Sequence, residues 1–288
     1  MCKRFLILSL GIAFAAVLMG AIGCKPESAA KRVQGSAAPE KHGDTHGHAD
    51  AHGEHSAHAP GSTTTAQLIR GAGWEQPTPN SPLTLRFHVE EGGKPVTEFE
   101  VLHERPMHFI AVRDGLDEFL HLHPTLSKDG TAEVKIEFPA PGKYWLYLDV
   151  KPVGSTQQTI RQELQVPGSA APPAELKASL PETVEVDGVK SLISLVKKPE
   201  GSIVSFEHSG SDGSPITNLE PYLGGMGHLV VIGAKTGEYV HAHPESQTAS
   251  DGKVLFAVHF QQPGMYKAWG QFQREGRIFT VPVVLAVE

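Results

Sequence analysis

The chain has 288 residues, of which 40% are apolar and 20% charged, a composition typical of a soluble globular protein rather than a disordered one. Its formal net charge of −7, with no basic cluster beyond the first few residues, argues against a nucleic-acid partner, because such proteins concentrate lysine and arginine on one face. The length is sufficient for two ordinary domains.

Residues 1–23 have the layout of a secretory signal peptide. Lys3 and Arg4 give a positive start, residues 5–19 form an apolar run, and small residues lead directly to Cys24. This ending resembles the bacterial lipobox, in which the cysteine is acylated and becomes the new N-terminus. An uncleaved membrane anchor is the alternative, because the apolar run approaches spanning length. We therefore expect a lipid on Cys24 and a chain held at a membrane of the bacterial cell envelope, facing the periplasm or the exterior.

Cys2 and Cys24 are the only cysteines of the chain. Cys2 would leave with the signal peptide and Cys24 would carry the lipid, so the mature domains contain neither a thiol nor a disulfide. This excludes a cysteine nucleophile and a thiolate metal ligand.

Residues 24–65 are rich in alanine, glycine, serine and histidine, and they cannot bury enough apolar surface to offset the entropy of ordering. We expect a disordered tether. Six of the 17 residues from 42 to 58 are histidine, and tracts of this kind are associated with metal capture. A flexible tether also tolerates any polar residue, but this density favours metal binding of low selectivity. The predicted tether ligands are His42, His46, His48, His52, His55 and His58.

Beyond the tether, short runs of β-branched and aromatic residues alternate with glycine, proline and aspartate turn signals, and no segment keeps a 3.6-residue period. Strands that recur about every ten residues predict β-sandwiches or barrels. A stretch rich in proline and alanine, residues 167–179, is the predicted linker between two domains. The predicted strands include residues 83–89, 132–138, 143–150, 201–208, 253–260 and 279–287.

The chain contains the same pattern twice. Residues 93–124 match residues 213–244 at an offset of 120 without a gap, and nine of the 32 positions are identical. After a two-residue insertion in the second copy, the match resumes through the motif FxxPGxY. We therefore expect an all-β chain with two tandem cupredoxin-like or immunoglobulin-like β-sandwich domains, residues 66–166 and 180–288.

Three of the nine identical positions are histidine. In the first copy these are His108, His121 and His123, and the last two share a face because strand residues alternate. If the two strands pair with Val112 opposite Phe119, then His108 faces His123, and all three imidazoles lie on one face of one hairpin. Such a set predicts a metal site with room for a fourth ligand. The second copy repeats the pattern with His228, His241 and His243, which predicts one site per domain.

Some other side chains are weaker candidates. Met107 and Met226 lie within two residues of a cluster histidine, and a thioether favours Cu(I), although methionine also fills gaps in cores. His88 and His208 also share the offset of 120, but the strands around them align better after a one-residue shift. The histidines found in one copy only, His103 and His259, are expected at the surface. A cluster histidine can also serve a structural role by bonding a loop carbonyl.

The combination of GxPVT, a strand start in which Met or Gly precedes His, HxHP and FxxPGxY resembles the YtkA-like group of secreted bacterial β-domains, and the resemblance covers both copies but not the tether. That group is cupredoxin-like in architecture and often sits near copper-handling genes. The resemblance therefore implies a fold and copper as the metal more than it implies an activity. A blue-copper electron carrier is excluded, because the mature domains lack the cysteine ligand.

Together these features predict a lipid-anchored envelope protein that binds transition-metal ions, copper first and zinc second, as a chaperone, a buffer or a resistance factor. Its partners would be the membrane and other metal-handling envelope proteins. The alternative is an envelope interaction module with structural histidines and no metal. A metal-dependent hydrolase with Glu118 or Glu238 as base is the third interpretation. Because alternation places Glu118 on the face opposite His121 and no nucleophile motif is visible, we expect no enzymatic activity.

Overall fold

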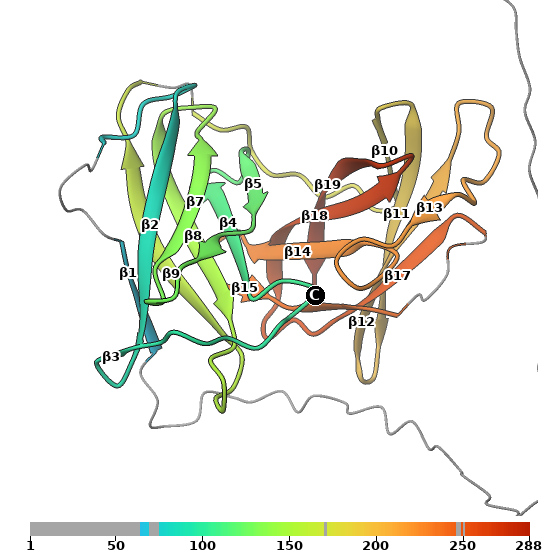
Figure 1. Cartoon of the computed structure of the whole chain (residues 1–288). Coiled ribbons are helices and arrows are strands. Elements are labelled where there is room, and N and C mark those ends of the chain that lie inside the picture. Colours follow the sequence, from blue (N-terminus) through green and yellow to red (C-terminus); the bar gives the residue numbers. More distant parts are fainter. Residues whose placement is uncertain (1–63, 69–74, 170–171, 246–248, 250) are drawn as a thin grey trace, which may run out of the picture. The chain divides into compact units, whose positions relative to one another are not determined.

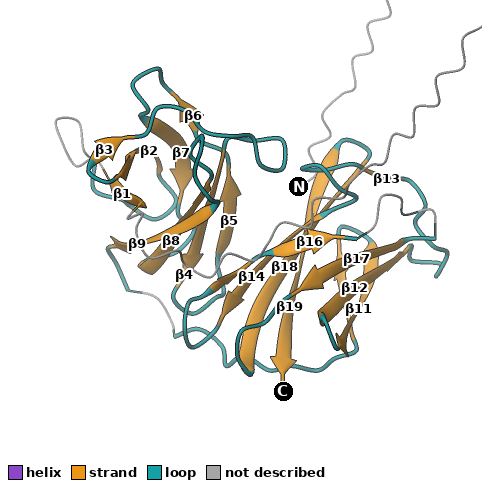
Figure 2. Cartoon of the chain, turned by 90° about the horizontal axis from the view of Figure 1, so that it is seen from below, coloured by secondary structure: helices purple, strands orange, loops and turns teal. Residues whose placement is uncertain are grey.

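The structure is a computed structural model that describes residues 64–68, 75–169, 172–245, 249 and 251–288 (Figure 1). The predicted signal peptide, Cys24 and the six tether histidines lie outside these described residues. In the part of the chain that is described, all the regular secondary structure is β-strand (Figure 2). No helix in this part is long and apolar enough to cross a membrane.

The first copy folds into a sandwich of two sheets. Its strands are β1 (Thr64–Leu68), β2 (Pro82–Glu91), β3 (Lys94–Pro95), β4 (Met107–Arg113), β5 (Phe119–Leu122), β6 (Thr125–Leu126), β7 (Ala132–Glu137), β8 (Gly142–Val150) and β9 (Gln158–Val166). One sheet has the order β1-β2-β7-β6, with β3 beside β2, and the other has the order β5-β4-β8-β9. In β2 the apolar residues alternate with polar ones, so Leu85 and Phe87 enter the core while Arg86 points outward.

The second copy repeats this arrangement. Its strands are β10 (Glu182–Val186), β11 (Val189–Lys198), β12 (Gly201–Ser209), β13 (Leu219–Glu220), β14 (His228–Gly233), β15 (Tyr239–Val240), β16 (Ala242–Pro244), β17 (Lys253–Val258), β18 (Gly264–Arg274) and β19 (Arg277–Val287). One sheet has the order β10-β11-β12-β17-β16, and the other has β13-β18-β14-β15 with β19 also paired to β18. The prediction of an all-β chain with two tandem β-sandwiches is therefore confirmed.

The backbone hydrogen bonds also confirm the one-residue shift around His88 and His208. The Val96 amide donates to the Val89 carbonyl, and its counterpart Ile216 donates to the His208 carbonyl. His208 therefore takes the place of Val89 and is buried in the second sandwich, while His88 lies on the other face of β2.

Both faces of β4 are covered, and this places the site. Every residue of β4 is buried, because Phe109 and its alternate neighbours enter the core of the first sandwich while Ile110 and Val112 face the other way. Ile110 and Val112 pack in a separate apolar cluster with Val230 and Ile232 of β14. The two sandwiches therefore meet through the same face of each copy.

Candidate metal centre

The histidines gather at one end of this shared apolar cluster. His108 lies on the same face of β4 as Ile110, and His228 lies on the same face of β14 as Val230, each on the face that points away from the core of its own sandwich. The packing of Ile110 near Val230 therefore also brings the two imidazoles together. Their rings are stacked, with centroids 5.5 Å apart and an interplanar angle of 9°. One histidine thus comes from each sandwich.

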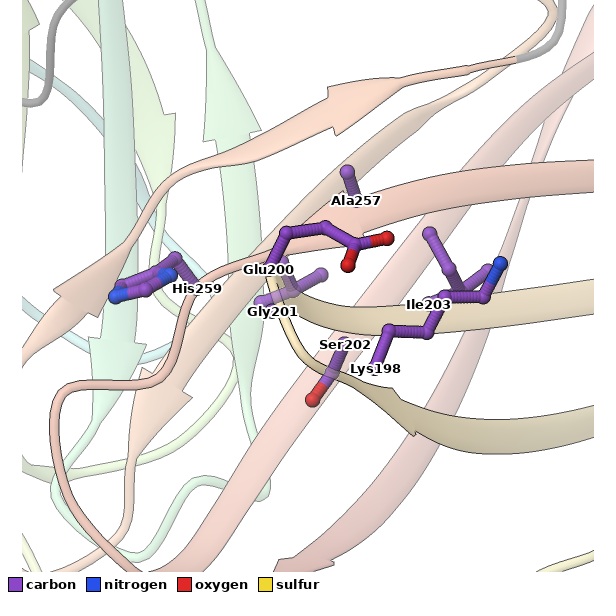
Figure 3. A pocket seen from close by; sticks show the side chains of 8 residues that line it. Lys198, Glu200, Gly201, Ser202, Ile203, Ala257 and His259 are labelled. Carbon is purple, nitrogen blue, oxygen red and sulfur yellow. The ribbon is translucent and has the colours of Figure 1, made fainter.

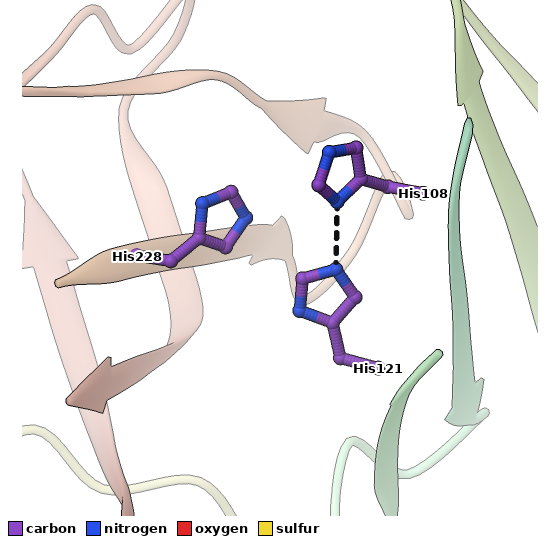
Figure 4. Close-up of side chains that lie close together, drawn as sticks. All are labelled: His108, His121 and His228. Carbon is purple, nitrogen blue, oxygen red and sulfur yellow. Dashed lines mark hydrogen bonds between the residues drawn. The ribbon is translucent and has the colours of Figure 1, made fainter. Parts of the chain in front are cut away.

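The third member, His121, arrives by the predicted hairpin register. Val112 pairs with Phe119 and Ile110 pairs with His121, as the sequence predicts. This register places Nε2 of His121 3.0 Å from Nδ1 of His108 (Figure 4). The ligand atoms of His108, His121 and His228 all lie within 4.8 Å of one another. Among the described residues this is the single group of three or more His, Cys, Asp or Glu side chains with that geometry.

The hydrogen bonds identify which nitrogen of each ring has a lone pair. Nε2 of His108 lies 2.9 Å from the Leu102 carbonyl oxygen, and Nδ1 of His121 lies 2.6 Å from Oε1 of Gln271. Both oxygens only accept, so these outer nitrogens have the protons. The inner nitrogens, Nδ1 of His108 and Nε2 of His121, then face each other with lone pairs at 3.0 Å. Two facing lone pairs repel, and a cation between them removes the repulsion.

This separation fits a shared ion. Two nitrogens bound at 2.0–2.1 Å in tetrahedral geometry are about 3.3 Å apart, so only a small adjustment of the two rings is needed. Nε2 of His228 is buried and has no hydrogen-bond partner among the described residues. A buried nitrogen of this kind carries a desolvation cost that a bound cation would offset.

Burial keeps the imidazoles neutral, which is the form that binds metal. Desolvation is the main cause that lowers the pKa of His121 to about 3, although its hydrogen bond to Gln271 acts in the opposite direction. Desolvation also lowers the pKa of His108, and it lowers the pKa of His228 well below the ordinary value. The rings are therefore poor proton acceptors near neutral pH while their lone pairs remain open to a metal.

Two further imidazoles flank the triad. The His123 ring lies 5.0 Å from the rings of both His108 and His121, and its Nε2 is also buried with no hydrogen-bond partner among the described residues. The His103 ring lies 5.9 Å from His108 and 5.4 Å from His228. His103 is half-buried. The expected surface position is confirmed for His259, which is exposed, while His103 is only partly exposed and adjoins the triad.

Of the predicted second-copy ligands, His228 belongs to the compact group and His241 does not. Strand β15 ends at Val240, and the chain then crosses to the other sheet, where the His243 backbone pairs with Ala257 of β17. The hairpin of the first copy is thus repeated in the same register but ends one residue before His241, and His228 joins the first-copy histidines. The compact group is therefore shared between the domains, and a separate site in the second domain stays a prediction.

His241 lies against the first sandwich. Its Nε2 is 3.2 Å from Thr159 Oγ1, and its Nδ1 is 3.9 Å from the buried carboxylate of Asp149. Asp149 is paired with His108 in the ladder just as Gln271 is paired with His228, so His121 and His241 each reach across to equivalent positions of the opposite copy. The contacts follow a pseudo-two-fold relation, which is broken because only His121 is in the compact group.

The methionines are not at the cluster. Met107 alternates with His108 and packs in the core of the first sandwich, and Met226 packs in the core of the second. Both thioethers therefore pack with apolar core residues, and thioether ligation stays a prediction that this packing does not support. His208 is also a core residue, in contact with Phe272 and hydrogen-bonded to Ser191.

A pocket of the second sandwich is built from different residues. Figure 3 shows it at the ends of β12 and β17, where its lining includes Lys198, Glu200, Ser202 and His259. It has one imidazole and one carboxylate, so it offers no set of three metal ligands.

The sequence contained one signal of the shared site. Ile110 and Val112 are apolar on the histidine face of the hairpin, and Val230 and Ile232 are apolar at the same positions of the second copy. An apolar outer face on both copies indicates a second packing surface. The sequence pattern did not indicate that His103 lies beside the triad, because its place depends on the path of a turn and not on strand alternation.

Comparison with known proteins identified one family. The family model described as "Domain of unknown function (DUF8832)" matches residues 65–168 and again residues 185–288. Comparison with curated proteins found no match.

Several solved structures are similar at low identity. The Escherichia coli adhesin FdeC has 13% identity and a TM-score of 0.25, covering 79% of this chain and 64% of its own. Invasin, a bacterial integrin-binding protein, has 16% identity and a TM-score of 0.21, covering 78% of this chain and 40% of its own. A segment of two fibronectin type-III domains from chicken tenascin has 11% identity and a TM-score of 0.23, covering 77% and 97%. The chain thus spans less than two thirds of the two bacterial proteins.

Proposed function

The chain belongs to the family described as a domain of unknown function (DUF8832) and contains two of its domains in tandem, and on that premise we propose that it binds one transition-metal ion in the site that both domains share. The observation that supports this most strongly is the pair of lone-pair nitrogens on His108 and His121, 3.0 Å apart, beside the unpartnered Nε2 of His228. A structural role would leave these three nitrogens unsatisfied, whereas an ion satisfies all of them.

We place copper first and zinc second as the metal. Three neutral imidazoles suit both metals, and no thiolate or carboxylate belongs to the compact group. The resemblance of the motifs to the YtkA-like group supports copper. With the methionines placed in the cores, the preference for copper over zinc rests on that resemblance.

The cellular role that fits is metal handling in the bacterial envelope, as a chaperone, a buffer or a resistance factor. The lipobox-like sequence supports a lipid on Cys24, and the histidine-rich segment between residues 42 and 58 supports ion collection beside the folded site. The chain would act with other metal-handling envelope proteins. It would bind and release an ion rather than catalyse a reaction, since no nucleophile motif accompanies the site.

Metal stoichiometry tests the proposal. We would replace the six tether histidines with asparagine, purify the chain without an affinity tag and measure metal per chain. We expect one tightly bound ion. His121→Ala should abolish tight binding, because it removes one of the two facing nitrogens.

His241→Ala is the matched control, because His241 is the repeat counterpart of His121 and lies outside the compact group. It should retain the ion. If His121→Ala binds as much metal as the parent, the triad is not the site. If the parent binds no metal, the alternative of an interaction module with structural histidines is correct.

A further inference from the structure

We propose that His103 is a further ligand of this ion, supplied by the turn of residues 102–105. The inference rests on the proposed function and deepens it, because it names the residue that completes the coordination of an ion held by His108, His121 and His228. Such a site needs a fourth donor to become tetrahedral.

The turn that bears His103 has an unfavourable backbone for its residues. Leu102 and Arg105 pair through two backbone hydrogen bonds of 2.8 and 2.9 Å. His103 and Glu104 between them have φ of 47° and 65°, the left-handed values of a type I′ turn. Glycine and asparagine adopt these values most readily, whereas histidine and glutamate adopt them at a conformational cost.

The second copy makes the same turn and relieves the cost at one of its two positions, where Gly224 replaces Glu104. Leu223 and Gly224 stand at the equivalent positions, with φ of 54° and 82°, and the flanking Tyr222 and Gly225 pair as Leu102 and Arg105 do. The turn itself therefore needs neither histidine nor glutamate. Leu223 keeps the positive φ at the position of His103, so the backbone does not select histidine there, and the case for His103 rests on what its ring contacts.

The side chain is presented to the triad. The His103 ring is 5.4 Å from His228 and 5.9 Å from His108, close to the 5.0–5.5 Å that separates the triad rings from one another. The same turn orients a triad member, since the Leu102 carbonyl accepts the Nε2 proton of His108. His103 lies outside the group whose ligand atoms are within 4.8 Å, so rotation of its side chain must bring a nitrogen onto the ion.

His103 is better placed than His123 to close the site across the two sandwiches. His123 contacts His108 and His121, which are both residues of the first copy. His103 contacts one triad member from each copy. It is also half-buried, whereas His228 is buried, so it lies between the triad and solvent.

The double substitution His103→Leu and Glu104→Gly tests this, because it installs the turn sequence that the second copy already uses. In the full-length chain with asparagine at the six tether histidines, we would measure Zn²⁺ affinity by chelator competition and record the Co²⁺ absorption spectrum. We expect one ion per chain in both proteins. We expect a loss of about ten- to a hundredfold in Zn²⁺ affinity, a changed Co²⁺ spectrum, and an apo melting temperature no lower than that of the parent.

His103→Asn is the second variant, since asparagine tolerates a positive φ and keeps the turn. His259→Leu is the control, because it removes an exposed histidine that lies outside the cluster. If either turn variant keeps the parent's Zn²⁺ affinity and Co²⁺ spectrum, His103 is not a ligand and the inference is overturned. If the parent itself binds no ion, the proposed function fails, which is a different outcome.

Discussion

His121 of the first sandwich donates its Nδ1 proton to Oε1 of Gln271 in the second, across 2.6 Å. Nε2 of Gln271 in turn donates to Oγ1 of Thr280 across 3.4 Å, and this bond holds the Gln271 amide, with its acceptor Oε1, in place. The bond fixes the tautomer of His121 and aims Nε2 at His108. A residue of one copy thus orients a candidate ligand of the other.

Loss of this bond should weaken metal binding without removing a ligand. Gln271→Leu should lower affinity by about ten- to a hundredfold, the range found for residues that orient a ligand histidine. Gln271→Glu keeps an acceptor and should restore most of the affinity. Gln273→Leu, two residues along β18, is the control. Equal affinity in the parent and Gln271→Leu, measured by chelator competition, would contradict an orienting role.

A bound ion should stabilise the two sandwiches together. Its ligands come from both, so it binds only while they are docked, and free ion at a hundred times the Kd adds about 2.7 kcal/mol to the docked state. Thermal unfolding of the chain with asparagine at the tether histidines should therefore move to higher temperature with Zn²⁺. His228→Ala should lose the shift and His241→Ala should keep it. A shift that survives in His228→Ala would place the ion elsewhere.

Metal affinity should be less sensitive to acid than a site of ordinary imidazoles. A free imidazole has a pKa near 6.5, so it is protonated below about pH 6 and can then no longer bind a metal ion. Burial lowers the pKa of His121 to about 3 and also lowers the pKa of His108 and His228, so the triad stays neutral to lower pH than free imidazoles do. Affinity measured at pH 7 and pH 5 should differ little, apart from the proton sensitivity of the chelator. A steep fall between pH 6.5 and 5.5 would argue for exposed ligands.

His208 should make the second sandwich sensitive to acid. Burial lowers its pKa to about 4, from 6.5 in the unfolded chain. A lowered folded pKa means that the unfolded state binds the proton more readily, so stability is lost as pH falls from 6.5 towards 4, by about 2 kcal/mol at pH 5. In the first copy the pair Ala66 and Val89 occupies the positions of Ser191 and His208. The double variant Ser191→Ala and His208→Val therefore removes the titrating imidazole and installs the pair that the first copy already uses.

Between pH 7 and pH 5, the free energy of unfolding of that double variant, measured in urea, should fall by about 2 kcal/mol less than that of the parent. His88→Val is the control, because His88 lies on the other face of its strand. An equal pH dependence in the parent and the double variant would mean that His208 is not the group that titrates.

Cys24 should determine attachment to the membrane. Cys24→Ala removes the acylated residue that the lipobox-like sequence implies, and the chain should then leave the membrane fraction or remain unprocessed. Mass spectrometry of the parent should find a lipid on Cys24. Processing that is the same in the variant, with no lipid on the parent, would contradict the anchor.

The sequence by itself determined the repeat, the strands and the register of the first hairpin. These follow from local rules, because alternation sets the faces of a strand, and shifting the pairing by one residue would turn His121 to the opposite face. The same alternation places Met107 and His108 on different faces of the strand, so the sequence also indicated the core position of Met107. Local pattern alone was therefore sufficient to identify His108 and His121 as neighbours.

Only the tertiary structure decided that His228 joins them while His241 does not. A periodic pattern shows which face of a hairpin is apolar or histidine-bearing, but not which surface packs against it. Here the face of one copy packs on the same face of the other, which brings together residues 120 positions apart. His241 is excluded because β15 ends after two residues and the chain crosses to the other sheet, a choice made by the packing of the whole sandwich. The site lies where the two copies pack together, and the sequence of one copy does not show which surface packs against it.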